Sequence, residues 1–412
     1  MDTSQPISAG LSARQASVGT IRGTPHPLTS NPVTTPPNPL RVLHIYRTYF
    51  PETQGGGQEV IRQFCLATSS RGVENTVFAL AKEPDPKDLD LPEAHLRRSK
   101  SHFEIASCDF GGIDALLSCR RMASRADILQ IYYPWPFADA MLPFVRQGKP
   151  VIVTYISDIV RQRRLDAAYA PLRRYLLGSA DAITVTSPAF ANSSPVLRSY
   201  SEKLRIVPYC LGEASPPDSG RADHWERQLG KGFFLFVGVL RYYKGLEFLI
   251  RGASRTKHAI VIVGDGPERS RLESMACTLG ASNVAFLGAL PDIDKHALYS
   301  LCRAVVLPSH QRSEAFGMTL LEAARAGKPM ISCEIGTDTS WVNLDGETGL
   351  VVPPSDADAL THALNVLAGN ESLCQRFGLA ASMRWRTHYS TQVVGEKLRS
   401  LYETLTRRDQ AA

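Results

Sequence analysis

The chain has 412 residues, of which 43% are hydrophobic and 21% are charged, with 46 Lys and Arg against 40 Asp and Glu. This length exceeds what one compact core usually holds and favours two domains of roughly 150–200 residues. The ordinary apolar fraction excludes a fibrous or wholly disordered protein. No apolar run approaches the ~20 residues of a membrane-spanning helix, and no secretory signal is visible.

The basic excess is unevenly distributed. Residues 41–212 carry 22 basic and 17 acidic side chains, whereas residues 213–412 carry 22 of each. This favours an anionic surface, lipid or ligand as the partner of the first half. The eight cysteines are scattered without a C-x-x-C pair. Such spacing predicts reduced thiols, a cytoplasmic location and no metal site.

Residues 1–40 contain 18 Pro, Ser or Thr and few charges. They predict a disordered leader, although a start codon placed too far upstream would explain them equally well. The first strand is expected at 41–46, followed by a loop with Pro51 and three glycines and by a helix at 58–71. The remaining elements expected in this half are strands at 76–80, 128–132, 151–155 and 182–186, and helices at 113–123, 138–147 and 166–177.

Residues 212–231 resemble a linker, and the alternation then restarts. The expected strands are 233–237, 259–263, 284–287, 304–307 and 330–333, and the expected helices are 246–253, 268–279, 292–302 and 317–326. A closing helical stretch runs from about Ala357, with a break near Gly369. Strands alternating with helices predict parallel sheets covered on both faces.

We therefore predict an α/β protein of two tandem doubly wound, Rossmann-like domains, at 41–212 and 213–385. Residues 386–412 are expected to form a C-terminal helix that packs back on the first domain. In doubly wound folds, ligands bind beyond the carboxyl ends of the strands. The predicted cleft thus lies between the two domains.

Glycine-rich turns mark both predicted domains. Gly55, Gly56 and Gly57 stand between a strand and a helix, where backbone N–H groups can approach a phosphate. A plain tight turn is an equally good explanation. Gly264 and Gly266 follow an apolar strand and permit either close ligand approach or turn geometry alone.

Two cations follow the first strand of the second domain. Arg241 and Lys244 lie on the connection from that strand to the next helix. Two positive charges at this place suit a diphosphate leaving group, whose developing negative charge they would stabilise. The alternative is a solvated basic loop.

The most specific string runs from Leu307 to Ala323 and contains Glu314 and Glu322. Eight residues are a little over two helical turns, so a helix beginning at Glu314 would carry both carboxylates on one face. Such carboxylates can accept hydrogen bonds from sugar and ribose hydroxyls, and free N–H groups at the helix start can bind phosphate or sugar oxygens. Those N–H groups belong to Phe316, Gly317, Met318 and Thr319.

These motifs, in this order, resemble family 4 glycosyltransferases, which are retaining enzymes of the GT-B fold. The resemblance covers roughly residues 41–405. The segments 133–136, 157–160 and 336–343 are similar to those of bacterial mannosyl- and rhamnosyltransferases, which use GDP-sugars to build lipopolysaccharide or exopolysaccharide.

The resemblance implies roles for single residues. Gly55 and Gly56 would approach the distal phosphate of the donor, and Lys244 would neutralise the diphosphate with help from Arg241. Glu314 would contact the transferred sugar, and Glu322 would hold the ribose hydroxyls. The acceptor side would include Tyr133, Trp135, Ser157 and Asp158, with Asp158 also near the reaction centre.

The implied reaction moves a hexosyl group, mannose or rhamnose, from a nucleotide-diphosphate sugar to a lipid-linked saccharide, without a metal or cofactor. A GDP-sugar is favoured and a UDP-sugar is the alternative. The family often has His where this chain has Ile156, which leaves open a catalytically impaired nucleotide-sugar-binding protein. A sugar-nucleotide epimerase of the same architecture is a further alternative.

An Arg-rich segment, residues 161–174, could dock peripherally on the anionic inner face of the cytoplasmic membrane or bind an acceptor phosphate. An ordinary solvated helix face explains it equally well. Nucleic-acid binding is not expected, because no stacking platform accompanies the arginines.

Overall fold

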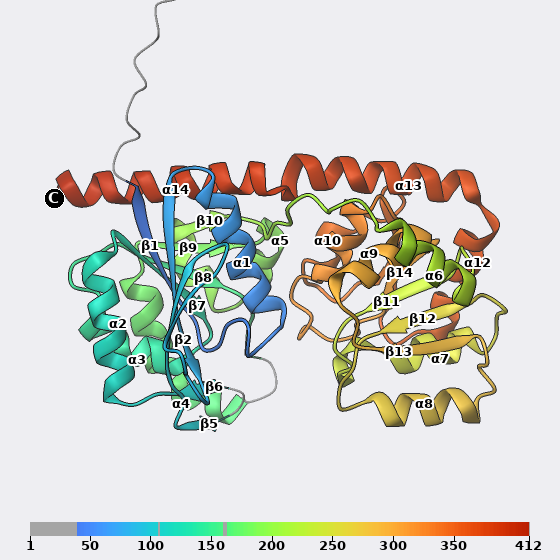
Figure 1. Cartoon of the computed structure of the whole chain (residues 1–412), viewed down its shortest axis with the longest axis horizontal. Coiled ribbons are helices and arrows are strands. Elements are labelled where there is room, and N and C mark those ends of the chain that lie inside the picture. Colours follow the sequence, from blue (N-terminus) through green and yellow to red (C-terminus); the bar gives the residue numbers. More distant parts are fainter. Residues whose placement is uncertain (1–38, 106–107, 160–162, 412) are drawn as a thin grey trace, which may run out of the picture. The chain divides into compact units, whose positions relative to one another are not determined.

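The computed structural model of the chain describes residues 39–105, 108–159 and 163–411 (Figure 1). The predicted leader therefore lies almost wholly outside the described residues. The compact unit is Pro39–Ala412. Within the described residues, the strands form one eight-stranded, one six-stranded and one two-stranded sheet. The first sheet belongs to the part of the chain up to residue 206, called here the first half, and the six-stranded sheet belongs to the second half.

The first sheet has the strand order β10-β9-β8-β7-β1-β2-β4-β3, and every pair is parallel except β3 with β4. The chain reverses direction across the sheet at β1, which lies between β2 and β7. The strands are β1 (Leu40–Ile45), β2 (Val73–Ala81), β3 (Asp88–Asp90), β4 (His95–Lys100), β7 (Ile128–Tyr133), β8 (Val151–Tyr155), β9 (Ala182–Val185) and β10 (Leu204–Ile206).

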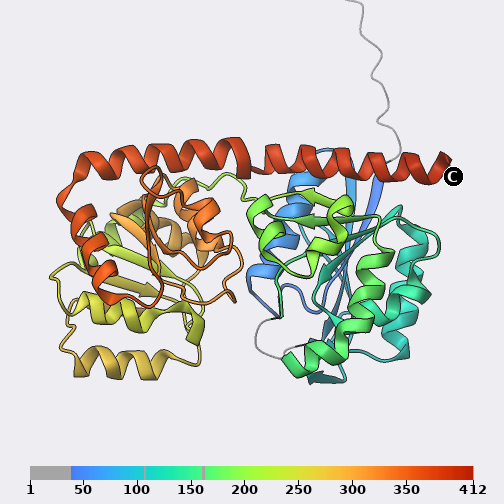
Figure 2. The same cartoon turned by 180° about the vertical axis from the view of Figure 1, so that it is seen from behind.

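Side chains from alternate positions of β1 enter two different cores. Leu43 and Ile45 join the core that includes buried side chains of α2 (Ile113–Arg125), α3 (Pro136–Val145) and α4 (Arg163–Ser179). Val42 joins the core that includes α1 (Gly56–Ser69) and α14 (Thr391–Ala411). Each face of the sheet is therefore covered by helices, as Figures 1 and 2 show from opposite sides. Shorter elements complete this half: the hairpin β5 (Phe103–Ile105) and β6 (Cys108–Phe110), α5 (Pro188–Ser193) and η1 (Leu197–Lys203).

The second sheet has the order β13-β12-β11-β14-β15-β16 and is wholly parallel. This is the doubly wound order, with its reversal between β11 and β14, so the structure confirms the predicted fold class. The strands are β11 (Phe234–Val237), β12 (Ile260–Val263), β13 (Val284–Gly288), β14 (Ala304–Leu307), β15 (Met330–Cys333) and β16 (Gly349–Val352). The helices are α6 (Ser219–Leu229), η2 (Tyr242–Lys244), α7 (Leu246–Ala253), α8 (Arg269–Thr278), α9 (Asp292–Leu301), α10 (Met318–Arg325), α11 (Thr339–Val342), α12 (Ala357–Gly369) and α13 (Glu371–Arg384).

The last helix returns to the first half. After η3 (Trp385–Tyr389), α14 packs against α1. The Tyr402 hydroxyl donates to Gln130 Oε1 of β7 at 2.6 Å, and the Arg71 guanidinium donates to the Gln392 carbonyl at 2.8 Å. A side chain at Gly395 would lie 2.3 Å from the Ala67 carbonyl, so the two helices meet at backbone distance. The domain limits at residues 212 and 385 stay a prediction.

One expectation about local structure was wrong, and one geometry that the sequence left open is excluded. The expected linker 212–231 contains α6, whose Asp218 cap accepts from the Arg221 N–H. Its Trp225 donates to Asp294 of α9, a contact that no local pattern indicates. The helix expected at 317–326 is α10 (Met318–Arg325), and Gly317, with a φ of +83°, precedes its first turn, which excludes a helix beginning at Glu314. Glu314 therefore precedes the helix that carries Glu322, and the two do not share one helical face.

Candidate active site

Three consecutive glycines, Gly55, Gly56 and Gly57, lie at the N-terminus of α1. The space around Gly55 and Gly56 differs from the space around Gly57. A Cβ on Gly56 would meet nothing within 4 Å, and one on Gly55 would meet only the Gln58 side chain. A Cβ on Gly57 would lie 2.5 Å from the buried Tyr46 hydroxyl. Gly57 is therefore required for packing, whereas Gly55 and Gly56 leave free space at a helix N-terminus, where N–H groups lack helical partners.

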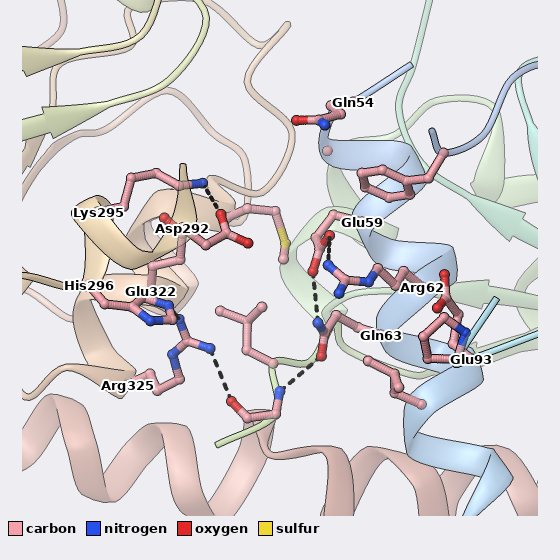
Figure 3. Close-up of a pocket in the computed structure, with 18 of the residues that line it drawn as sticks. Gln54, Glu59, Arg62, Gln63, Glu93, Asp292, Lys295, His296, Glu322 and Arg325 are labelled. Carbon is pink, nitrogen blue, oxygen red and sulfur yellow. Dashed lines mark hydrogen bonds and ion pairs between the residues drawn. The ribbon is translucent and has the colours of Figure 1, made fainter. Parts of the chain in front are cut away.

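Gly55 and Gly56 line a pocket of about 690 Å³. Figure 3 shows the charged side chains of α1 on one side of this pocket and those of α9 and α10 on the other. The polar side chains that line it include Glu59, Arg62 and Gln63 of α1, and Asp292, Lys295, His296, Glu322 and Arg325 of α9 and α10. The predicted ribose-binding carboxylate and the predicted phosphate-binding glycines thus share one pocket.

Glu322 is held in place by α9. The Tyr299 hydroxyl donates to its Oε2 at 2.5 Å. Burial, together with the Glu322 charge, raises the pKa of Tyr299, so this hydroxyl stays protonated and keeps donating. One carboxylate oxygen of Glu322 is thus engaged with protein, and the side chain faces the pocket.

Asp292 and Lys295 form an ion pair at 2.6 Å on the first turn of α9. Burial acts to raise the pKa of Asp292, but the hydrogen bond from Lys295 and the positive charges of Lys295, His296 and Arg62 together outweigh it, and the net shift is downward. Across the pocket, burial raises the pKa of Glu59. Sequence reasoning missed Asp292 and Lys295, because an exposed Asp and Lys at a helix start look like ordinary helix-terminal charges.

A second cluster lies in the second half, at the ends of β11 and β14. Lys244 Nζ is 2.5 Å from Glu314 Oε2, and the Ser309 hydroxyl donates to the same oxygen at 3.0 Å. Lys244 and Glu314 are both buried. Burial acts to lower the pKa of Lys244, but the charge and hydrogen bond of Glu314 together with the Tyr243 hydroxyl outweigh it and the net pKa is raised, so the ammonium stays charged.

Close backbone packing explains the glycine beside Lys244. Gly245 has a φ of +68°, and a Cβ there would lie 2.0 Å from the Pro308 carbonyl. The His310 N–H donates to the Tyr243 carbonyl at 3.0 Å. These contacts attach the Lys244 loop to the loop that carries Ser309 and Glu314. Arg241 lies at the start of the Lys244 loop and is exposed.

The other predicted donor-side residues divide into packing residues and pocket residues. A Cβ on Gly264 would lie 2.0 Å from the Gly238 carbonyl, and one on Gly266 would lie 2.5 Å from the Leu240 carbonyl. The absence of a side chain at both positions therefore allows the backbones at neighbouring strand ends to pack in contact. Phe316 is buried, with its ring centre 4.8 Å from that of Tyr209. The Thr319 hydroxyl donates to the Val237 carbonyl, while Met318 lines the pocket with Glu322.

On the predicted acceptor side, only Ser157 and Asp158 are accessible. Tyr133 and Trp135 have no exposed surface; the Tyr133 ring stacks on Tyr155, and the Trp135 indole donates to the Asp109 carbonyl at 2.7 Å. We therefore treat both as core residues in this structure and leave them out of the acceptor surface. Ile156 is partly buried and packs against the core.

Asp158 is held by residues far apart in the chain. It accepts from the hydroxyls of Tyr155 and Ser194 at 2.8 and 2.7 Å, and Arg312 of the second half lies 3.8 Å away. Arg312 also donates to the Ser193 hydroxyl at 3.1 Å. Arg312 had no signal in the sequence beyond its position two residues before Glu314.

A second connection between the halves centres on Asp338. This side chain is fully buried and accepts hydrogen bonds from the hydroxyls of Thr186 and Ser187. Burial raises the pKa of Asp338 to about 6, although the two hydroxyl hydrogen bonds act in the opposite direction. Sequence reasoning missed this contact because it joins residues about 150 positions apart.

Within the described ranges, no three His, Cys, Asp or Glu side chains gather closely enough to hold a metal ion. The same part of the chain has no helix of the length and apolarity needed to cross a membrane.

Two family models match the chain. Residues 55–210 match the glycosyl transferase 4-like domain, and residues 222–384 match glycosyl transferases group 1. The D-rhamnosyltransferase WbpZ of Pseudomonas aeruginosa is 44% identical over 349 residues, which are 84% of this chain and 91% of that protein. The O-antigen chain mannosyltransferase C of Escherichia coli is 41% identical over 367 residues, covering 89% of this chain and 99% of that protein.

Solved structures share the fold. Sucrose-phosphate synthase from Thermosynechococcus elongatus superposes with a TM-score of 0.74 at 20% identity, covering 90% of this chain and all of that one. Anabaena HepE in complex with UDP gives a TM-score of 0.71 at 15% identity, covering 89% of this chain and all of that one. By its sequence relatives and its two doubly wound sheets, this chain belongs to the group 1 glycosyltransferases with a 4-like N-terminal domain, and it is a transferase of the GT-B fold.

Proposed function

We propose that the protein transfers a mannosyl or rhamnosyl group from a GDP-sugar to a lipid-linked saccharide during cell-surface polysaccharide synthesis. The two relatives above support the sugar and the pathway class, since both cover more than four fifths of this chain. The observation that carries the donor part is the placement of Gly56 and Glu322 in one pocket of about 690 Å³.

The proposed donor pose follows from the chemistry of each group. The ribose hydroxyls donate to the Glu322 carboxylate, which Tyr299 orients. The diphosphate lies near the N–H groups that follow Gly55, where no Cβ blocks its approach. Lys244 and Arg241 supply positive charge near the leaving group, and Glu314 contacts the transferred sugar.

Retaining glycoside hydrolases use a carboxylate nucleophile about 5 Å from a second carboxyl group. Lys244 and Ser309 both contact Oε2 of Glu314, and pairing with a cation makes this carboxylate a weaker nucleophile, while Oε1 can still contact the transferred sugar. We therefore propose a front-face reaction, in which the bond to the leaving diphosphate breaks on the same face that the acceptor hydroxyl attacks. The leaving phosphate oxygen takes the acceptor proton while the cations stabilise its charge.

The pocket also supports a guanine base. Guanine presents its N1–H and its 2-amino group side by side, and a carboxylate such as Asp292 can accept from both. Uracil presents one N–H between two carbonyl oxygens, so the second oxygen of a carboxylate would face a carbonyl. Lys295 keeps Asp292 ionised, which maintains its two acceptors.

The proposal is tested by thermal shift with GDP-mannose, UDP-glucose and ADP-glucose on the whole chain, with Asp292→Asn as the variant. We expect stabilisation by GDP-mannose, and an affinity about tenfold lower in the variant, since one good bidentate contact contributes roughly 1–3 kcal/mol. Stabilisation by UDP-glucose alone would overturn the GDP assignment and favour the UDP alternative.

A second candidate function rests on Ile156, which can neither donate a hydrogen bond nor titrate. A protein that binds GDP-mannose without turning it over would be a nucleotide-sugar-binding paralogue. The discriminating measurement is release of GDP from GDP-mannose or GDP-rhamnose in the presence of a membrane extract that holds lipid-linked saccharides. Release that depends on the extract supports transfer, whereas binding without release supports the paralogue.

A further inference from the structure

The helix α2 presents two of its large apolar side chains to solvent, while Leu116 and Met122 are partly buried and pack against the core. Ile113 and Leu117 are 76% and 56% exposed, although they lie one turn apart on the same side of the helix. The residues it buries against the sheet are small: Ala115, Cys119 and Ala123. A helix that only covered a sheet would place its largest apolar groups inward. The outer stripe of α2 is therefore apolar for a reason other than the core.

The hairpin that precedes α2 extends this apolar surface. Phe103 and Ile105 are 53% and 52% exposed, and they point to the same side of β5 because they alternate along it. Phe103 stacks on Phe110 with ring centres 5.1 Å apart. His102 lies 3.7 Å from Asp114 in the first turn of α2, which places the hairpin beside the start of the helix. Figure 1 shows β5 and β6 where the chain enters α2.

Cations follow on the same helix. Arg120 and Arg121 come three and four residues after Leu117, so they continue its exposed stripe, and Arg125 lies one turn further. Among the residues that the structure describes, none of these three forms an ion pair. Arg121 and Arg125 also line a pocket of about 610 Å³ beside α2, whose lining includes Arg41 and Arg97 as well as the carboxylates of Glu74 and Asp88. The acidic groups on this surface are Glu104 and Asp114.

We propose that this hairpin–helix surface, made of Phe103, Ile105, Ile113, Leu117, Arg120 and Arg121, docks the enzyme on an anionic lipid bilayer. Apolar side chains would enter the boundary between headgroups and acyl chains, while the arginines contact lipid phosphates. Charge complementarity selects this occupant, because unpaired arginines border the apolar residues. The proposal deepens the proposed function, since a lipid-linked acceptor must be reached at a membrane.

This surface differs from the Arg-rich segment that the sequence indicated. Arg161 and Gln162 lie outside the described residues. In α4, Leu165 and Tyr175 are exposed, but Tyr169, Leu172 and Arg173 are partly buried. The large apolar side chains of the hairpin–helix surface are therefore more exposed than those of α4, and arginines without an ion-pair partner lie beside them.

The test is flotation of the whole chain with vesicles of phosphatidylglycerol and phosphatidylethanolamine, and separately with phosphatidylcholine vesicles. The variants are Ile113→Gln with Leu117→Gln, and Arg120→Glu with Arg121→Glu. A matched control is Leu379→Gln with Met383→Gln on α13, whose side chains are 74% and 69% exposed. We expect binding to the anionic vesicles only, about tenfold weaker in either test variant and unchanged in the control.

Absence of binding to anionic vesicles, or equal loss in the control, overturns the proposal. The surface could instead bind a second copy of this chain. Sedimentation velocity tests this second possibility. If the wild-type chain is a dimer, the Ile113→Gln, Leu117→Gln variant is a monomer, and vesicle binding is the same in both, the membrane proposal is overturned. The thermal shift with GDP-mannose separates the two proposals, because the vesicle variants leave the donor pocket intact. Vesicle binding without any GDP-mannose shift contradicts only the proposed donor.

Discussion

Lys244 Nζ and Glu314 Oε2 lie 2.5 Å apart, although the two residues are 70 positions apart in the chain. Neither side chain has more than 11% of its surface exposed. A buried pair is balanced between desolvation and attraction, so removing one partner costs more than removing both. This relationship allows the structural and chemical roles of the pair to be measured separately.

Lys244→Ala is expected to lower the free energy of unfolding by about 3–5 kcal/mol and to abolish transfer, because it leaves Glu314 buried without its counter-charge. The double variant Lys244→Met, Glu314→Leu should recover much of that stability and remain inactive. Urea denaturation and GDP release measure the two effects. Activity in the double variant would show that the pair has only a structural role.

The two glycines at the start of α1 should respond differently to the same substitution. Gly56→Ala places a Cβ in open space, so the fold should tolerate it while donor affinity falls. Gly57→Ala places a Cβ 2.5 Å from the Tyr46 hydroxyl, so stability should fall by about 1–3 kcal/mol. Melting temperature and the Kd for GDP-mannose distinguish them. Unchanged affinity for GDP-mannose in Gly56→Ala would contradict the proposal that the diphosphate binds at this helix N-terminus.

Tyr299 is expected to act as a positioning residue for Glu322. Tyr299→Phe removes the donor to Glu322 Oε2 and should weaken GDP binding several-fold, with a smaller effect on kcat than on KM. Glu322→Ala should reduce affinity further. The specific readout is the ratio of affinities for GDP and 2′,3′-dideoxy-GDP. That ratio should fall towards one in Glu322→Ala, and an unchanged ratio contradicts the ribose role.

Asp338 should give the protein a pH-dependent contribution to stability. Its folded-state pKa is about 6 against an ordinary value of 3.8, so the folded protein binds this proton more tightly than the unfolded chain does. The contribution is therefore fully present below pH ~4 and is lost as pH rises through about 6. A shift of about two pKa units corresponds to at most ~3 kcal/mol.

The difference between wild type and Asp338→Asn isolates this effect from other titrating groups. Nearby Tyr209 and Tyr389 do not contribute in this range, because burial raises the pKa of both hydroxyls. Wild-type stability relative to the variant should fall between pH 4 and pH 7 in urea titrations. A rise over that interval would mean that the Thr186 and Ser187 hydroxyls stabilise the charged carboxylate more than burial disfavours it.

Much of the fold could be predicted from local patterns. The strands at 151–155 and 304–307 and the helix at 246–253 match the structure residue for residue, because each is a short apolar or amphipathic run bounded by turn residues. Strand β16 and helix α6 were not predicted, although β16 is a short apolar run and α6 lies between an Asp218 cap and Gly230. Their position is stabilised by distant partners, as the Trp225 contact with Asp294 shows.

The sequence by itself determined the doubly wound alternation, the family, and the residue types of the donor site. Periodicity and glycine spacing are local properties, so they could be read without a structure. Only the tertiary structure decided which of those residues meet. It paired Lys244 with Glu314 and buried Tyr133 and Trp135. It also joined Asp338 to Thr186 and Ser187. These contacts depend on how strands distant in the chain are ordered within a sheet and how loops pack at their ends, which no local pattern encodes.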